Sequence, residues 1–196
     1  MEDSTERSTA KKNIHVLGIS GSLRKESFNT AALRAAAALL PAGMSLEMYE
    51  GWEKFPMFND DVKVQGFPPE VVEFGMRIAT ADALLFVTPE YNYSIPGGLK
   101  NAIDWASRLP DQPFNKKPVA IMSASTGMLG GGRAQYHLRQ SCVFLNMFPL
   151  NKPEVIISRA QEKFDAQGNL TDEPTREQIR KLLIALGEWT WQLQKT

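Results

Sequence analysis

Apolar residues come in short runs along most of this chain, with polar or glycine-rich stretches between them. Runs at residues 13–20, 83–88 and 117–124 have the length of strands and lack regular polar alternation. We therefore expect three strands of a parallel sheet, buried on both faces. Two shorter segments, residues 45–49 and 154–158, predict a second and a fifth strand.

Helical spacing of apolar residues fills the intervals between these strands. It predicts helices over residues 30–40, 70–80 and 133–145, another that opens near Gly97, and a last one capped by Thr171 or Asp172. The last helix carries a stripe typical of core or subunit contact rather than of a cofactor site. Its members are Ile179, Leu182, Leu183, Leu186, Trp189 and Leu193.

Alternation of strands and helices predicts an α/β fold, a doubly wound five-stranded parallel sheet of order 2-1-3-4-5 with helices on both faces. We expect residues 13–196 to form one domain and the polar residues 1–12 to form a flexible tail. The loops after strands one, three and four then meet at the carboxyl edge, where such sheets bind ligands. The irregular segment 52–61 favours an aromatic cluster over an active-site rim.

Composition excludes several classes of function. Lys plus Arg and Asp plus Glu are 22 each, without a basic cluster, so we expect no nucleic-acid partner. No apolar run approaches a membrane span and no secretory signal is visible, so we expect no membrane partner. The single cysteine, Cys142, forms no internal disulfide and fits a cytoplasmic location. It lies in an apolar context that indicates packing, and His15 and His137 lack partners at metal-ligand spacing, so we expect no metal site.

The loop after the first strand, residues 21–29, combines a glycine-serine turn with the start of a helix. Backbone N–H groups there attract a phosphate, and Ser20, Ser22, Ser27 and Asn29 add donors. Arg24 adds a charge-assisted contact. The loop is neither a dinucleotide fingerprint nor a Walker loop, so a monophosphate fits better. Alternatively, Ser27 or Asn29 simply caps the helix.

The loop after the third strand reads PEYNYSIPGGLKNAIDW, residues 89–105. Its prolines restrict the backbone, and Gly97–Gly98 lets backbone pass close to something flat. An ordinary strand-to-helix turn is the alternative. The stretch resembles the Pro-Glu-Tyr-Asn loop of NADPH-dependent FMN reductases, a flavodoxin-like group, and within it the bacterial chromate/quinone reductases. The resemblance implies that residues 89–92 lie along the FMN ring.

Two more loops share this resemblance. Residues 21–24 are similar to the family's Gly-Ser-Leu-Arg phosphate loop, and the glycine-rich residues 125–132 are similar to the loop beside the flavin pyrimidine. Three consecutive glycines favour close backbone approach to a ligand over a flexible linker. The implied cofactor-binding residues are Ser20, Ser22, Arg24, Ser27, Phe28, Asn29, Pro89, Glu90, Tyr91, Asn92, Ser125, Thr126, Gly127 and Gly130. Glu90 either accepts from the flavin or anchors the turn.

The sequence holds no catalytic triad, acid/base carboxylate pair or metal cluster, so a cofactor must carry the chemistry. We expect bound FMN to take hydride from NADPH or NADH and reduce quinones, chromate or similar acceptors by an alternating, ping-pong mechanism. No side chain is then catalytic. The nicotinamide preference and the physiological acceptor stay open.

Substrate contacts are expected from Asn92 and Tyr93, which border the open face. Asp104 and Arg108 are four apart on the predicted helix, which favours an exposed ion pair. The resembled family forms dimers and tetramers with FMN near the subunit boundary, so we expect a homodimer or homotetramer. Arg108 and Arg133 are then candidates for binding an anionic acceptor. A polar network between subunits would comprise Tyr93, Arg133, Tyr136 and Glu154.

Two other functions compete with a reductase. A flavodoxin-type electron carrier would bind FMN and serve a protein partner, but such carriers are strongly acidic and this chain has a pI near 6.8. A flavin-binding regulatory protein would hold FMN without turnover.

Overall fold

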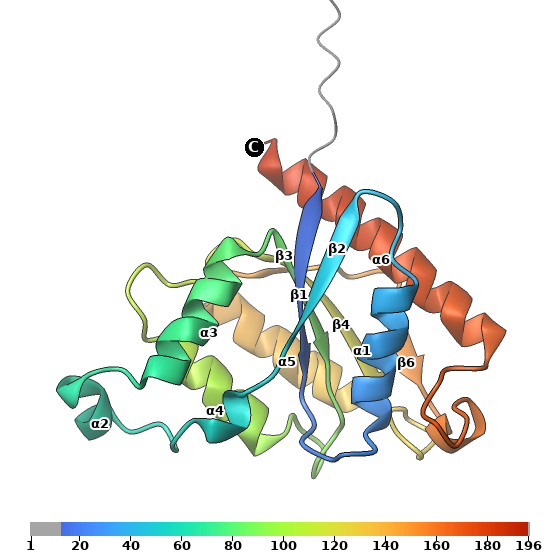
Figure 1. The fold of residues 1–196 in the computed structure, drawn as a ribbon, viewed down its shortest axis with the longest axis horizontal. Coiled ribbons are helices and arrows are strands. Elements are labelled where there is room, and N and C mark those ends of the chain that lie inside the picture. The colour runs from blue at the N-terminus through green and yellow to red at the C-terminus, as the bar shows by residue number, and fades with distance from the viewer. Residues whose placement is uncertain (1–12, 196) are drawn as a thin grey trace, which may run out of the picture.

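A computed structural model describes residues 13–195 as a parallel sheet with helices on both faces (Figure 1). The predicted tail, residues 1–12, lies outside the described residues. The strands are β1 (Ile14–Ser20), β2 (Met44–Tyr49), β3 (Ala83–Val87), β4 (Pro118–Ala124), β5 (Phe148–Pro149) and β6 (Val155–Ile157). The α-helices are α1 (Phe28–Ala38), α2 (Asp60–Gln65), α3 (Pro69–Thr80), α4 (Gly97–Ala106), α5 (Gly132–Phe144) and α6 (Glu173–Gln194), and the short 3-10 helices are η1 (Trp52–Lys54) and η2 (Ala160–Glu162).

The strand order confirms the predicted flavodoxin-like sheet. The order is β2-β1-β3-β4-β5, all parallel, and β6 also pairs with β4. The fifth position is therefore shared by two short strands. β5 faces Pro118 and Val119 at the start of β4, and β6 faces its last three residues.

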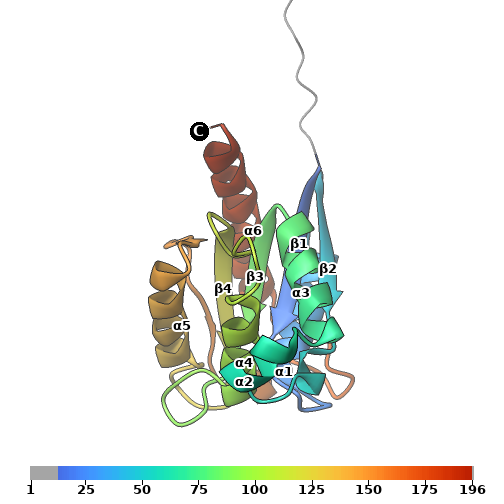
Figure 2. The ribbon, with the colours of Figure 1, turned by 90° about the vertical axis from the view of Figure 1, so that its left-hand side faces the viewer.

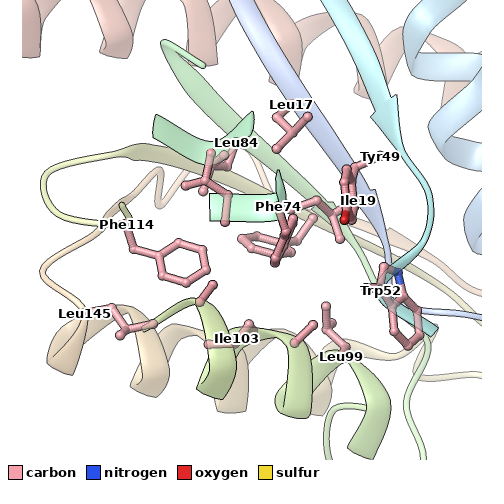
Figure 3. Packing of buried hydrophobic residues seen from close by; sticks show 14 of the residues in the cluster. Leu17, Ile19, Tyr49, Trp52, Phe74, Leu84, Leu99, Ile103, Phe114 and Leu145 are labelled. Carbon is pink, nitrogen blue, oxygen red and sulfur yellow. The ribbon is translucent and has the colours of Figure 1, made fainter. Parts of the chain in front are cut away.

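Two hydrophobic clusters hold the helices to the sheet, one on each face. Side chains that alternate along β1 point to opposite sides, so Leu17 and Ile19 join one cluster and Ile14 and Val16 the other. The first cluster packs α3, α4 and α5 against the sheet, and Figure 3 shows Phe74, Leu99 and Phe114 among the side chains that fill the space between strands and helices. The second packs α1 and α6 on the opposite face, and the turned view shows α6 behind the strands (Figure 2).

The irregular segment after β2 contains two elements that periodicity did not predict. α2 buries none of its residues and is held by the Asn59 side chain, which accepts from the Asp61 N–H at 2.9 Å. The aromatic-cluster prediction is confirmed, because Trp52 and Phe55 are buried in the first cluster and Phe58 packs edge-on against Trp105. The segment closes one end of the core.

Helix α6 begins at the Asp172 cap, one of the two predicted positions, and buries Ile179, Leu182, Leu183 and Leu186 of its predicted stripe. Within residues 13–195, none of the helices combines the length and the apolar character needed to span a bilayer.

Candidate functional site

The loops after β1, β3 and β4 converge on one hollow of about 190 Å³ at the carboxyl edge of the sheet, the lower edge in Figure 1. Each loop contributes predicted residues. The lining is Ser22, Arg24, Ser27, Phe28, Asn29, Pro89, Glu90, Tyr91, Ala124, Ser125 and Thr126. Ala124 was not predicted to line the site. Its position at the end of β4, next to the predicted residue Ser125, could have indicated it.

The first loop is shaped by hydroxyl groups. Ser27 caps α1, with its Oγ accepting from the N–H groups of Asn29 and Thr30, both at 3.2 Å. Ser20 Oγ lies 2.8 Å from Thr30 Oγ1 and accepts from the Ser22 N–H at 3.4 Å. The loop is thus fixed while the Arg24 side chain stays exposed beside the hollow.

Asn29 joins the first loop to the third. Its side-chain amide donates to the Ala124 carbonyl at 2.9 Å and accepts from the Ala124 N–H at 2.8 Å. The side chain is only 4% exposed, so it acts as an extra pairing position beside β4. The structure gives Asn29 the role of positioning two loops, and its predicted contact with a cofactor stays a prediction.

An ion pair anchors the second loop to α5. Glu90 accepts from the Arg133 Nε–H at 2.6 Å and from the Arg133 backbone N–H at 3.1 Å, and Arg133 Nη2 completes the pair. The hydrogen bond to Glu90 raises the pKa of Arg133. Of the two predicted roles for Glu90, the structure shows the anchor.

The tip of the second loop is a tight turn with a strained backbone. Asn92 and Tyr93 have φ of +50° and +68°, and Tyr91 and Ser94 exchange backbone hydrogen bonds of 2.9 and 3.0 Å. Positive φ at both central positions is costly for residues other than glycine. The Arg133 guanidinium carbon, 3.5 Å from the Tyr93 ring centroid, supports the turn.

His137, which lacks partners at metal-ligand spacing, also supports this turn. His137 Nδ1 on α5 lies 3.0 Å from Ser94 Oγ. Two successive turns of α5 therefore hold the loop, through Arg133 and then His137. Their spacing of four along a helix next to the glycine-rich loop was the only sequence signal.

The glycines of the third loop serve packing. A Cβ at Gly130, where φ is +55°, would stand 2.6 Å from Ile156 Cγ2, and one at Gly131, where φ is +87°, would stand 2.9 Å from Ser123 Cβ. Gly130 is buried and does not line the hollow. These two glycines are required by close packing against β4 and β6, and the predicted approach of the loop backbone to a ligand stays a prediction. Gly127 is exposed, and its N–H donates to Ser125 Oγ at 3.1 Å.

The flat group beside Gly98 is a side chain of the protein. A Cβ at Gly98 would stand 2.6 Å from Trp52 Cζ3. Trp52 in turn donates its indole N–H to the Ser20 carbonyl at 3.1 Å, at the end of β1. Figure 3 shows this indole next to Leu99. Trp52 therefore supports the start of the first loop through this hydrogen bond, a role that the sequence did not predict.

The predicted ion pair between Asp104 and Arg108 is wrong. α4 ends at Ala106, so Arg108 no longer lies one helical turn beyond Asp104. Asp104 instead accepts from the Lys100 ammonium at 2.6 and 2.7 Å, and the Arg108 guanidinium lies over the Phe58 ring at 5.5 Å. Arg108 lies outside the hollow, so its contact with an acceptor stays a prediction that needs a neighbouring subunit.

The four residues predicted to link subunits form two pairs within the chain. Tyr93 stacks with Arg133, and Tyr136 donates to Glu154 at 2.9 Å. The Tyr136 hydroxyl holds the pKa of Glu154 below its usual range. Their contact with a second subunit stays a prediction.

Cys142 is buried, and burial raises the pKa of its thiol to about 11, which confirms a packing role. Across residues 13–195, no three His, Cys, Asp or Glu side chains are grouped so as to hold a metal ion.

Known proteins similar to this chain in sequence and fold are reductases and oxidoreductases. The family model described as NADPH-dependent FMN reductase matches residues 14–162. An NAD(P)H-dependent FMN reductase of Pseudomonas aeruginosa is 58% identical over 93% of this chain and 98% of its own length. A quinone reductase of Escherichia coli K12 is 45% identical over 91% and 96% of the two chains. The solved structure of the flavoenzyme NAD(P)H:(acceptor) oxidoreductase FerB from Paracoccus denitrificans aligns with a TM-score of 0.83 and 32% identity, covering 91% and 98%.

Proposed function

The chain belongs to the family of NADPH-dependent FMN reductases, and from this membership we propose an FMN-dependent oxidoreductase that passes electrons from NADPH or NADH to quinones. FMN and NAD(P)H are accordingly its cofactor and its electron donor. The observation that carries the proposal is the convergence of three loops on one hollow whose side chains suit a phosphorylated, flat cofactor.

The donor groups of the hollow fit a monophosphate. Arg24 supplies a fixed positive charge, and Ser22 and Thr126 supply hydroxyls. Ser27 Oγ already accepts two backbone N–H groups, so its one O–H donor is left for an anion. Pro89 and the half-exposed Tyr91 ring add apolar surface for a flat ring. The set matches the chemistry of FMN.

Bound FMN supplies the redox chemistry, taking a hydride from the nicotinamide and giving electrons to the acceptor. The protein holds the cofactor through residues 20–29 and orients it with the strained turn at Asn92–Tyr93. Among residues 125–127, the Ser125 and Gly127 N–H groups already donate to the Ile157 carbonyl and to Ser125 Oγ, so the Thr126 N–H is the backbone donor that would stabilise negative charge on the pyrimidine side. Because the lining contains no acid/base pair, we assign no catalytic side chain.

Four finer points belong to the same proposal. Nicotinamide and acceptor use one open face in turn, which gives ping-pong kinetics, with Asn92 and Tyr93 as contacts. Chromate joins the quinones as an acceptor. The enzyme is a cytoplasmic homodimer or homotetramer. Arg108 and Arg133 meet an anionic acceptor near the subunit boundary.

Steady-state kinetics test the proposal. FMN-saturated protein should oxidise NADPH or NADH with a benzoquinone as acceptor, and double-reciprocal plots at several quinone concentrations should be parallel. Intersecting plots would overturn the alternating mechanism while leaving the activity in place. Protein that binds no FMN would overturn the whole proposal.

The electron-carrier alternative is separated by one further measurement. NADPH added without an acceptor should bleach the bound flavin within the time of a few turnovers. A carrier, or a flavin-binding regulatory protein, would show only the slow oxidation given by free FMN.

A further inference from the structure

A second cavity of about 270 Å³ adjoins the hollow. It lies between the start of α1 and the turn after η2, and Arg24, Ser27 and Phe28 line both spaces. A ligand in one space therefore lies next to a ligand in the other. The remaining lining residues are Lys25, Glu26, Ala31, Arg34, Asp165, Ala166, Gln167 and Gly168.

The charges of this cavity favour an anion. Arg24, Lys25 and Arg34 are exposed, and none of the three pairs with a carboxylate in the part of the chain from 13 to 195. Of the two acidic lining residues, Asp165 accepts from the N–H groups of Gln167 and Asn169 at 3.0 and 2.7 Å.

The other carboxylate, Glu26, is exposed to water and forms no ion pair within residues 13–195. Three cations therefore line the cavity with two carboxylates, which leaves a net positive charge.

The far wall of the cavity is a hydrogen-bonded turn that leaves room for Arg34. Asp165 and Asn169 close a turn, with the Gly168 N–H donating to the Asp165 carbonyl at 2.9 Å. Gly168 has φ of +77°, and a Cβ there would stand 3.1 Å from Arg34 Nη2. Glycine at this position therefore keeps the guanidinium unobstructed.

An apolar wall completes the cavity. The Phe28 ring packs against Phe164 with centroids 5.4 Å apart, and Ala31 of α1 lies alongside. Positive charge beside an aromatic wall suits a phosphorylated nucleoside, in which a base stacks and a phosphate pairs.

We infer that this cavity binds the 2′-phosphate end of NADPH, with Arg34 and Lys25 as the residues that select NADPH over NADH. The inference rests on the proposed function, which requires a nicotinamide dinucleotide beside FMN. The two donors differ only in the 2′-phosphate, so a cationic site is the physical basis for preferring one. Arg24 is assigned to the FMN phosphate, which leaves Arg34 and Lys25 for the second anion.

Kinetics of charge-removing variants test the assignment. In Arg34→Gln, kcat/KM for NADPH should fall about tenfold, as expected for loss of a charge-assisted contact, while NADH is unaffected. Lys25→Gln should act in the same direction. Arg77→Gln on α3 removes the same charge from another surface and should change neither donor. An equal loss for NADPH and NADH in Arg34→Gln would overturn the inference.

Binding of nucleotide fragments gives a readout without turnover. By calorimetry on FMN-saturated protein, adenosine 2′,5′-bisphosphate should bind more tightly than adenosine 5′-monophosphate, and Arg34→Gln should abolish the difference. Equal binding to the unaltered protein would overturn the inference. If neither nicotinamide is oxidised, the proposed function fails, and the two fragments still decide whether the cavity recognises a 2′-phosphate.

Discussion

At the scale of single residues, neighbouring glycines at the start of α4 have unequal roles. Gly97 faces open space, whereas a Cβ at Gly98 would enter the ring of Trp52. Gly98→Ala should lower the free energy of unfolding by about 1–3 kcal/mol, as expected for overpacking a core. Denaturant unfolding measures this, with Gly97→Ala as the matched control.

The same pair of variants tests the link from core to site. Trp52 bonds the Ser20 carbonyl, so its displacement in Gly98→Ala should also weaken FMN binding. If Gly98→Ala and Gly97→Ala bind FMN and unfold alike, the proposed support of the first loop by Trp52 is wrong.

Glu90 gives a second residue-scale prediction. Without its carboxylate, Arg133 loses the partner that fixes the strained Asn92–Tyr93 turn. Glu90→Gln should weaken FMN binding about three- to tenfold, consistent with a partly exposed ion pair. Fluorescence titration of FMN measures the change, and Glu188→Gln, an exposed glutamate on α6, is the control. Unchanged FMN affinity would show that the Asn92–Tyr93 turn does not depend on the Glu90–Arg133 ion pair.

At the scale of elements, apolar runs located most strands within one residue, because burial on both faces leaves an uninterrupted signal. α2 was missed since it buries none of its residues and so has no apolar stripe. β5 was missed because it has two residues, one of them Pro149. Helix α4 was extended too far because its apolar spacing carried no stop signal near Ala106.

The cap of α6 provides a pH-dependent prediction. The Thr175 side-chain hydroxyl, together with its N–H at 2.9 Å, holds the pKa of Asp172 below its usual value. A carboxyl group whose pKa is lower in the folded than in the unfolded protein stabilises the fold at pH values above the unfolded pKa. This stabilisation is lost as the pH falls through the folded pKa. Asp172→Ala should therefore cost about 1 kcal/mol at pH 7, and progressively less below about pH 4.

Thr171→Ala is the matched control for this cap. Thr171 was the alternative cap in the sequence, but its hydroxyl donates to the Lys163 carbonyl at 3.2 Å. Urea unfolding at pH 7 and at pH 3 should show a pH-dependent loss for Asp172→Ala alone. A loss of the same size at both pH values would mean that ionisation of Asp172 contributes nothing to the stability of the cap.

At the scale of the whole molecule, the sequence predicted where the site lies but not which residues contact one another there. Strand order alone brings three loops to one edge, and the structure confirms that they line one hollow. Pairings such as Asn29 with Ala124 join positions 95 apart, and no local pattern encodes them. The sequence also could not assign Gly130 to packing, because Ile156 approaches it only once β6 lies beside β4.

Assembly of subunits is the last prediction, and it concerns the outer face of α5. Val143 and Phe144 are 80% and 78% exposed, next to a groove of about 190 Å³ that Arg108 also lines. Adjacent large apolar side chains in water favour burial against a second copy. Phe144→Glu should place an unpaired charge in that interface and shift the mass towards monomer, as sedimentation velocity would show.

The matched control places the same charge on another exposed apolar residue. Val64 on α2 is 83% exposed and lies on a different element, so Val64→Glu should leave the mass unchanged. If assembly is what brings Arg108 near a neighbouring flavin, Phe144→Glu should also raise KM for chromate more than KM for an uncharged quinone. A dimer or tetramer that survives Phe144→Glu would move the interface away from α5 and leave Arg108 without a route to the flavin.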